Sequence, residues 1–116
     1  MSNIKSYFKT SSETIARLHV FEDKILKIVE EIITANNFNK KLLVAGNGGS
    51  CSDAEHFVGE LQCTYKDRAR KPVSAISLAS LPAAMTAWCN DFEFLSYFLL
   101  QFVFPLLNYH ILFHIS

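Results

Sequence analysis

A short apolar run followed at once by a glycine-rich turn and a helical pattern is the feature that most constrains this chain. Residues 42–45, Leu-Leu-Val-Ala, lie between a lysine pair and a glycine, as expected of a strand buried in a parallel sheet. Residues 46–50 have the sequence Gly-Asn-Gly-Gly-Ser, and a helical pattern then runs from near Cys51 to Leu61. We therefore predict a strand, a tight turn and a helix in direct succession.

A second unit of the same kind follows. Residues 73–78 have the composition of a strand, and Pro82 suits the first turn of a helix that continues through Trp88 and ends at Asn90-Asp91. Strands that alternate with helices at this spacing predict an α/β fold, a three-layer α/β/α arrangement around a parallel sheet. Ligands in such sheets bind beyond the carboxyl ends of the strands, which is where the glycine-rich turn falls.

The residues before these units predict one long N-terminal helix over residues 11–36. Thr10 and Glu13 have the spacing of a capping box, and Asn36-Asn37 ends the pattern. Apolar residues recur near a 3.6-residue period, at Ile15, Leu18, Ile25, Ile28, Val29, Ile32 and Ile33. Such a helix is about 39 Å long, more than a domain of this size needs for its own core, so we expect it also to pack against another subunit.

Charge and cysteine usage restrict the partners and the compartment. Lys plus Arg equals Asp plus Glu at 11 each, so no basic field is available for a nucleic acid or an anionic membrane surface. The 3 cysteines form no C-x-x-C pair, and the charged start of the chain does not resemble a secretory signal. We expect a cytoplasmic protein whose cysteines are ordinary buried side chains.

The end of the chain differs from the rest, because no charged residue follows Glu93. Its length is close to that of a membrane span, but Gln101, Pro105 and Asn108 interrupt it and no positive residues flank it. The alternative is a segment that is buried in the domain or covered by another surface. A shifted reading frame or a premature stop is a further hypothesis for so abrupt a change.

The glycine-rich turn can do more than connect two elements. Glycines permit positive φ and close backbone approach, so residues 46–50 can present amide groups to a ligand at the positive end of the next helix. Such a ligand would be anionic or rich in hydroxyl groups. The turn is neither a dinucleotide fingerprint nor a Walker A loop, and a plain tight connection remains the alternative.

Polar residues on the predicted helices are further candidate site residues, and each also has a purely structural interpretation. His56 and Glu60 are four residues apart on one helix face, where they could chelate a metal or share a proton, or form a solvated surface pair. Asn90-Asp91 could equally be a helix cap. The basic residues Lys66, Arg68, Arg70 and Lys71 are expected to form a solvated connection.

The motifs together resemble one family. The run from Gly46 to Phe57 with Glu60-Leu61, then Ala75-Ile76-Ser77-Leu78 and Asn90-Asp91-Phe92, is similar to the sugar isomerase (SIS) domain of phosphoheptose isomerases. The resemblance covers residues 1–98 as the N-terminal part of an SIS domain, and residues 99–116 form an uncharged apolar tail that does not match. It implies an incomplete SIS-type sheet, a homotetramer, and isomerisation of sedoheptulose 7-phosphate for lipopolysaccharide biosynthesis.

The resemblance also assigns roles to single residues. It implies that Asn47, Gly48, Gly49, Asn90 and Asp91 contact the sugar phosphate, that His56 and Glu60 bind zinc, and that Glu60 is the catalytic group that moves a proton between two carbons through an enediol. Activity is expected to be impaired in so short a chain, because the family's second half supplies further site residues. The alternative function is a non-enzymatic SIS-type scaffold that associates with the replication initiator.

Overall fold

The computed structural model describes the backbone of residues 3–63, 65–103 and 109–115, and side chains up to residue 101 within those ranges. The chain divides into two compact units, Met1–Glu31 and Ile32–Ser116. The first contains helix α1 (Ile4–Ala16), the 3-10 helix η1 (Arg17–Phe21) and the start of helix α2 (Glu22–Asn37). The second contains the end of α2 and all the remaining elements.

The predicted long N-terminal helical region is present, but it begins before residue 11 and a 3-10 segment divides it into two α-helices. Helix α1 begins at Ile4, where the Asn3 side chain accepts a hydrogen bond from the Lys5 amide at 3.0 Å and acts as the N-cap. Thr10 therefore lies inside the helix, and its carbonyl accepts the Thr14 hydroxyl at 2.8 Å. Asparagine is as good an N-cap as threonine, and it precedes a sequence that is already helical.

The 3-10 segment η1 separates the two α-helices. His19 lies beside the end of α1, with its Nδ1 atom 2.7 Å from the Ala16 carbonyl oxygen, a contact that fits the tighter turn there. The predicted end of the helical region at Asn36-Asn37 is confirmed, since α2 ends at Asn37.

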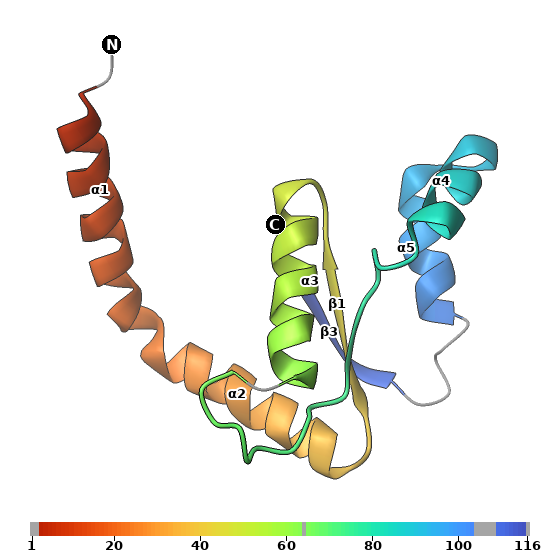
Figure 1. Cartoon of the computed structure of the whole chain (residues 1–116), viewed down its shortest axis with the longest axis horizontal. Helices are drawn as coiled ribbons and strands as arrows, with labels where there is room; N and C mark the ends of the chain where they lie inside the picture. The colour runs from red at the N-terminus through yellow and green to blue at the C-terminus, as the bar shows by residue number, and fades with distance from the viewer. Residues whose placement is uncertain (1–2, 64, 104–108, 116) are drawn as a thin grey trace. The chain divides into compact units, whose positions relative to one another are not determined.

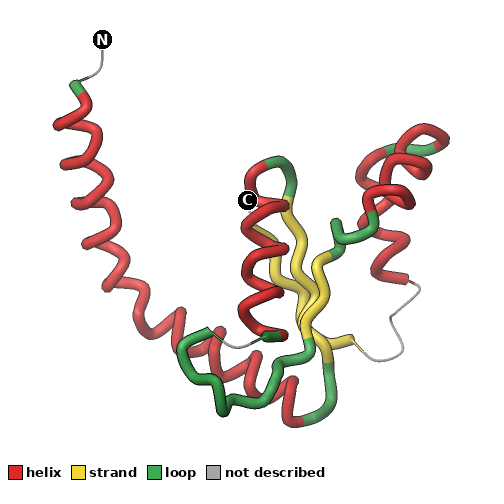
Figure 2. The backbone as a smooth tube through the Cα atoms, in the orientation of Figure 1, coloured by secondary structure: helices red, strands yellow, loops and turns green. Residues whose placement is uncertain are grey.

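The second unit is built on a three-stranded parallel sheet of order β2-β1-β3 (Figure 2). Strand β1 (Lys41–Gly46) is central, with β2 (Ala75–Ser77) on one side and β3 (Tyr109–Ile115) on the other. In the register, Leu42 pairs with Ala75 and Gly46 pairs with Ile115. The predicted buried parallel strand at residues 42–45 is confirmed.

Strand β2 is shorter than the predicted strand over residues 73–78. The Val73 amide donates to the Leu61 carbonyl at 2.9 Å, and the Ser74 amide donates to the Asn36 side chain at 3.1 Å. These two amides are therefore bonded to the helices around the sheet, and regular strand geometry begins only at Ala75.

Helices pack on both faces of the sheet, as the three-layer prediction requires (Figure 1). Leu42 and Val44 of β1 form a buried cluster with Ala54 and Val58 of helix α3 (Gly49–Gln62). The alternate residues of the strand face the other way, where Leu43 and Ala45 cluster with Leu78. Phe98 of helix α5 (Phe94–Val103) packs against this second cluster. The period-two alternation of β1 thus divides the core between two layers.

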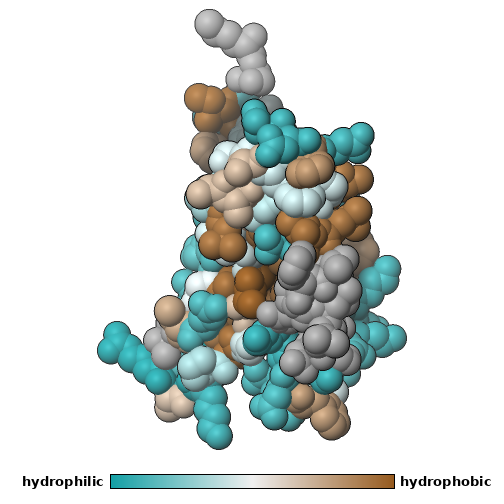
Figure 3. Space-filling model, turned by 90° about the vertical axis from the view of Figure 1, so that its right-hand side faces the viewer, coloured by the Kyte–Doolittle hydropathy of each residue, from teal (hydrophilic) through white to brown (hydrophobic). Residues whose placement is uncertain are grey.

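Helix α4 (Pro82–Asp91) begins with the expected proline and ends at the expected Asn90-Asp91 pair. Hydrophobic side chains remain at the surface around α4 and α5, seen from that side in Figure 3, and the exposed ones are Leu81, Phe92, Phe94, Leu95 and Leu99. The uncharged end of the sequence supplies all of α5 and all of β3. None of the helices in the described ranges is long and apolar enough to cross a membrane.

The expectation of buried cysteines is wrong. Cys63 is exposed at the end of α3, while Cys51 and Cys89 are half-buried, and all of them are free thiols. Cys63 follows the last turn of the helix and therefore faces solvent rather than the sheet.

Candidate functional site

The glycine-rich turn joins the carboxyl end of β1 to the amino end of α3. Gly48 has φ +58° and ψ −124°, a conformation that side chains disfavour strongly, and it is the N-cap of α3. A Cβ atom at Gly46 would collide with the backbone carbonyl of Ser50. Glycine is therefore required at position 48 because of the backbone conformation, and at position 46 because there is no room for a side chain.

Two hydrogen bonds close the turn onto the helix. The Ser50 amide donates to the Asn47 carbonyl and the Cys51 amide donates to the Gly48 carbonyl, both at 3.1 Å. The Ser50 and Cys51 amides are thus already bonded within the turn, and the positive end of the α3 dipole lies there. Residues 47–49 are exposed, so a ligand from solvent can approach this end of α3.

The strand order places this turn where α/β sheets bind ligands. From β1 the chain passes through α3 to β2 on one side of the sheet, whereas β3 returns on the other side. The order reverses at β1, which is the position at which a crevice opens beyond the carboxyl ends of the strands. Because Gly46 pairs with Ile115, the end of β3 lies beside the turn.

His56 and Glu60 lie together on α3, as their spacing predicts. His56 Nε2 is 3.4 Å from Glu60 Oε1, and the two side chains are 78% and 41% exposed. The pair is accessible to solvent and to a ligand. Glu60 follows Gly49 by about 16 Å along the helix axis, so the turn and the carboxylate lie toward opposite ends of α3.

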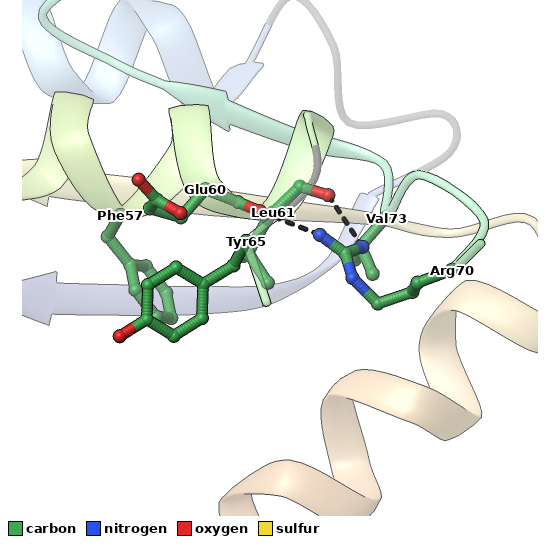
Figure 4. A pocket seen from close by; sticks show the side chains of 6 residues that line it. All are labelled: Phe57, Glu60, Leu61, Tyr65, Arg70 and Val73. Atoms are coloured by element: carbon green, nitrogen blue, oxygen red, sulfur yellow. Dashed lines mark hydrogen bonds between the residues drawn. The ribbon is translucent and has the colours of Figure 1, made fainter. Parts of the chain in front are cut away.

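Glu60 borders a cavity of about 380 Å³ near the carboxyl end of α3 (Figure 4). Most of the lining is apolar or aromatic, from Phe57, Leu61, Tyr65 and Val73, and Arg70 completes it. Glu60 lies at the edge of this lining, and its side chain is 41% exposed to solvent.

Asn90 and Asp91 end α4, and the Asn90 amide group donates to the Asp91 carboxylate at 3.0 Å. The Trp88 indole N–H in the last turns of the helix donates to the Ser96 hydroxyl of α5 at 2.8 Å, which joins the two helices. The described side chains include no recorded hydrogen bond or ion pair between Asn90-Asp91, the His56–Glu60 pair and the glycine-rich turn. Each group is therefore held by contacts within its own element.

The His56–Glu60 pair has the donor types that zinc prefers, but it is not a complete zinc site. A catalytic zinc ion takes three protein ligands and a structural one takes four. Across the described side chains, no group of three or more His, Cys, Asp or Glu residues could hold a metal. The pair could supply two ligands of a zinc site, and the others would have to come from outside the described side chains.

Arg70 was expected to belong to a solvated connection, and that expectation is wrong. It is half-buried, and its guanidinium donates to backbone carbonyls of the last turn of α3. The signal that could have identified it is the end of α3, which lacks both a glycine cap and a basic residue in its last turn.

Comparison with known proteins gives one consistent answer. A probable phosphoheptose isomerase of Thermoplasma acidophilum is 42% identical over 79 residues, which are 68% of this chain and 43% of that protein. The phosphoheptose isomerase of Aquifex aeolicus is 34% identical over 95 residues, which are 81% of this chain and 49% of that protein. Over most of its length, this chain is therefore similar to phosphoheptose isomerases.

Solved structures agree with this relationship. A phosphoheptose isomerase from Francisella tularensis matches with a TM-score of 0.77 at 30% identity, covering 85% of this chain and 52% of that one. The phosphoheptose isomerase from Neisseria gonorrhoeae matches with a TM-score of 0.74 at 25% identity. No family model matches the sequence. The chain spans about half the length of the phosphoheptose isomerases it matches, and the scaffold alternative has no support among them.

Proposed function

We propose that this chain is part of a sugar-phosphate isomerase that converts sedoheptulose 7-phosphate into D-glycero-D-manno-heptose 7-phosphate, and that its activity is impaired as it stands. The observation that carries this proposal is the glycine-rich turn at the point where the strand order reverses, with the amino end of α3 directly behind it. The relationship to phosphoheptose isomerases supports the choice of substrate.

In this proposal the turn binds the sugar phosphate. Asn47, Gly48 and Gly49 approach the ligand through backbone amides and the Asn47 side chain, which suit phosphate oxygens and hydroxyl groups. Asn90 and Asp91 supply further hydrogen bonds to hydroxyl groups from the end of α4. All five residues are exposed, so none needs to be uncovered before the ligand binds.

Glu60 is the group that moves the proton. Exchange between a ketose and an aldose requires a base that takes a proton from one carbon and returns it to its neighbour. The Glu60 carboxylate lies on an exposed face of α3 that a substrate can reach, and His56 lies beside it at 3.4 Å. His56 and Glu60 would hold zinc with ligands from outside the described residues, and zinc when bound would polarise the sugar carbonyl.

The separation of the turn from Glu60 favours a site shared between copies of the chain. The reacting carbons of sedoheptulose 7-phosphate, C1 and C2, lie at the other end of the sugar from its phosphate, but about 16 Å along α3 is farther than one sugar phosphate spans. A homotetramer would bring the turn of one copy toward the carboxylate of another. Apolar side chains exposed on the first unit, including Leu18, Ile25 and Val29, supply a surface for such association.

We also propose that the protein is cytoplasmic. A cytoplasmic enzyme of lipopolysaccharide biosynthesis would keep its thiols reduced, and Cys51, Cys63 and Cys89 are all free.

The experiment is to incubate the purified chain with sedoheptulose 7-phosphate and zinc in deuterated water and to follow deuterium entry into the sugar. Proton transfer through an enediol exchanges the transferred hydrogen with solvent, so this readout detects the step even when net conversion is slow. We expect incorporation above the buffer rate, with little net heptose 7-phosphate formed.

The matched variants are Glu60→Gln and Glu55→Gln, two carboxylates on the same helix. E60Q should reduce incorporation to the buffer rate, whereas E55Q should retain it. Incorporation that is no faster than buffer with the unaltered chain, or that survives in E60Q, would contradict the proposal.

A further inference from the structure

Arg70 makes a concentrated set of hydrogen bonds that no role described above explains. Its Nη1 atom donates to the carbonyls of Leu61 at 3.0 Å and Lys71 at 2.9 Å. Its Nη2 atom donates to the carbonyls of Glu60 at 2.7 Å and Cys63 at 2.9 Å. One guanidinium therefore bonds three carbonyls at the end of α3 and one of its own loop, and Figure 4 shows the bonds to Glu60 and Leu61.

The end of α3 needs such a partner. The last carbonyls of any helix lack partners within it, and they carry the negative end of the helix dipole. Cys63, the C-cap residue, has φ −89° and ψ −143°, so the left-handed glycine cap that commonly satisfies these carbonyls is absent here. A planar, permanently charged group with several donors satisfies both the hydrogen bonds and the dipole.

The bond to the Glu60 carbonyl matters most, because it connects Arg70 to the residue that carries the carboxylate. A helix end frays when its carbonyls are unpaired, and Glu60 lies within the last turn of α3. The Val73 amide also donates to the Leu61 carbonyl at 2.9 Å, so both the Arg70 side chain and the Val73 backbone connect the loop to the helix end. The backbone of this last turn of α3 sets the direction in which the Glu60 side chain points.

We propose that Arg70 is a positioning residue that fixes the last turn of α3 and thereby the carboxylate of Glu60. The effect on Glu60 rests on the proposed function, whereas the fixing of the helix end does not. Arg70 touches Glu60 only through its backbone and has no recorded bond to the carboxylate.

The test uses the full chain with Arg70→Gln, Arg70→Lys and the control Arg68→Gln. Arg68 is an exposed arginine of the same loop with no recorded contact among the described residues. Amide hydrogen exchange of residues 60–63 should accelerate at least about tenfold in R70Q, because several charge-assisted bonds are lost together. Exchange in β1 should change far less, and R68Q should match the unaltered chain. Exchange in residues 60–63 that is unchanged in R70Q would overturn the proposal.

Rescue separates the guanidinium group from simple packing of its side chain. Guanidinium ion at low millimolar concentration should restore part of the protection in Arg70→Ala, whereas sodium at the same ionic strength should not. R70K should recover little, because a lysine ammonium cannot span the same carbonyls. Equal behaviour of the two salts, or full protection in R70K, would contradict a role for the planar group.

A zinc titration, followed by the NMR signals of the His56 ring, connects Arg70 to Glu60. We expect E60Q to weaken binding and R70Q to weaken it about tenfold, the size usual for residues that orient a metal ligand. Weaker binding in E60Q with no change in R70Q would overturn the effect on Glu60. If E60Q binds zinc as the unaltered chain does, the proposed metal site is wrong, and the exchange and rescue results alone decide whether Arg70 fixes the helix end.

Discussion

Glycines that look alike in the sequence have different structural requirements. Gly48 has φ +58°, whereas Gly59 lies within α3 and a Cβ atom there would meet nothing within 4 Å. We expect Gly48→Ala to lower the free energy of unfolding by about 1–3 kcal/mol, the cost of a residue forced into a glycine-only conformation.

The matched control is Gly59→Ala. It should raise the free energy of unfolding by roughly 0.5–1 kcal/mol, since alanine favours the helix and has room there. Urea denaturation of the two variants measures both effects. Equal stability of G48A and the unaltered chain would show that the turn does not require a positive φ.

Because Tyr97 is buried, we predict that the free energy of unfolding falls in alkaline solution. Its side chain is fully buried at 0% exposure, its hydroxyl has no hydrogen-bond partner among the described residues, and burial raises its pKa above the ordinary 10.0, with Cys89 adding to the rise. The folded chain therefore holds this proton more tightly than the unfolded chain does. The stability that this provides is complete below about pH 10 and is lost as pH rises further.

Tyr97→Phe isolates this contribution. It removes the titrating hydroxyl and retains most of the packing, so stability near pH 8 should change little or rise. Between pH 9 and 11 the free energy of unfolding, measured in urea, should fall less in Y97F than in the unaltered chain. Parallel curves over that range would contradict the assignment to Tyr97.

For the helices of the first unit, the sequence pattern predicts the secondary structure but not what covers the apolar face. Their apolar period predicts helix, and they are helical, but α1 and η1 have no buried residue within the described part of the chain. The apolar residues of α1 and η1 therefore form a face that no described part of the first unit covers. We therefore expect this face to mediate self-association.

Ile25→Glu should shift the chain toward monomer, because Ile25 belongs to the apolar stripe and is 51% exposed. Lys27→Glu, an exposed position on the same helix outside the stripe, should leave association unchanged. Sedimentation velocity at several concentrations distinguishes the two. An unaltered chain that stays monomeric, or an I25E variant that associates as before, would contradict this role of the helices.

Local patterns predicted the elements that local interactions define. The apolar run of β1, the glycines before α3 and the proline of α4 each act within a few residues, and the corresponding elements lie where expected. The amides of Val73 and Ser74 instead bond to residues distant in sequence, so β2 is shorter than its composition suggests. Arg70 was missed for the same reason, since its partners lie in the preceding helix.

For the whole molecule, the sequence predicted the parallel sheet and the place of the turn, but not the strand order. The order β2-β1-β3 depends on pairing between β1 and a strand from the uncharged end of the chain, which no local pattern revealed. That pairing is what places the turn at the reversal of strand order. The His56–Glu60 spacing predicted their contact, whereas no described side chain joins the pair to complete a metal site.

In the proposed function, the glycine-rich turn at the carboxyl end of β1 binds a sugar phosphate. The most direct measurement is a titration of the isotopically labelled chain with sedoheptulose 7-phosphate, followed by backbone amide NMR shifts. We expect saturable shifts centred on residues 47–51, much reduced in Gly48→Ala. Shifts confined to the basic residues 66–71, or no saturable shift at the turn, would contradict the account.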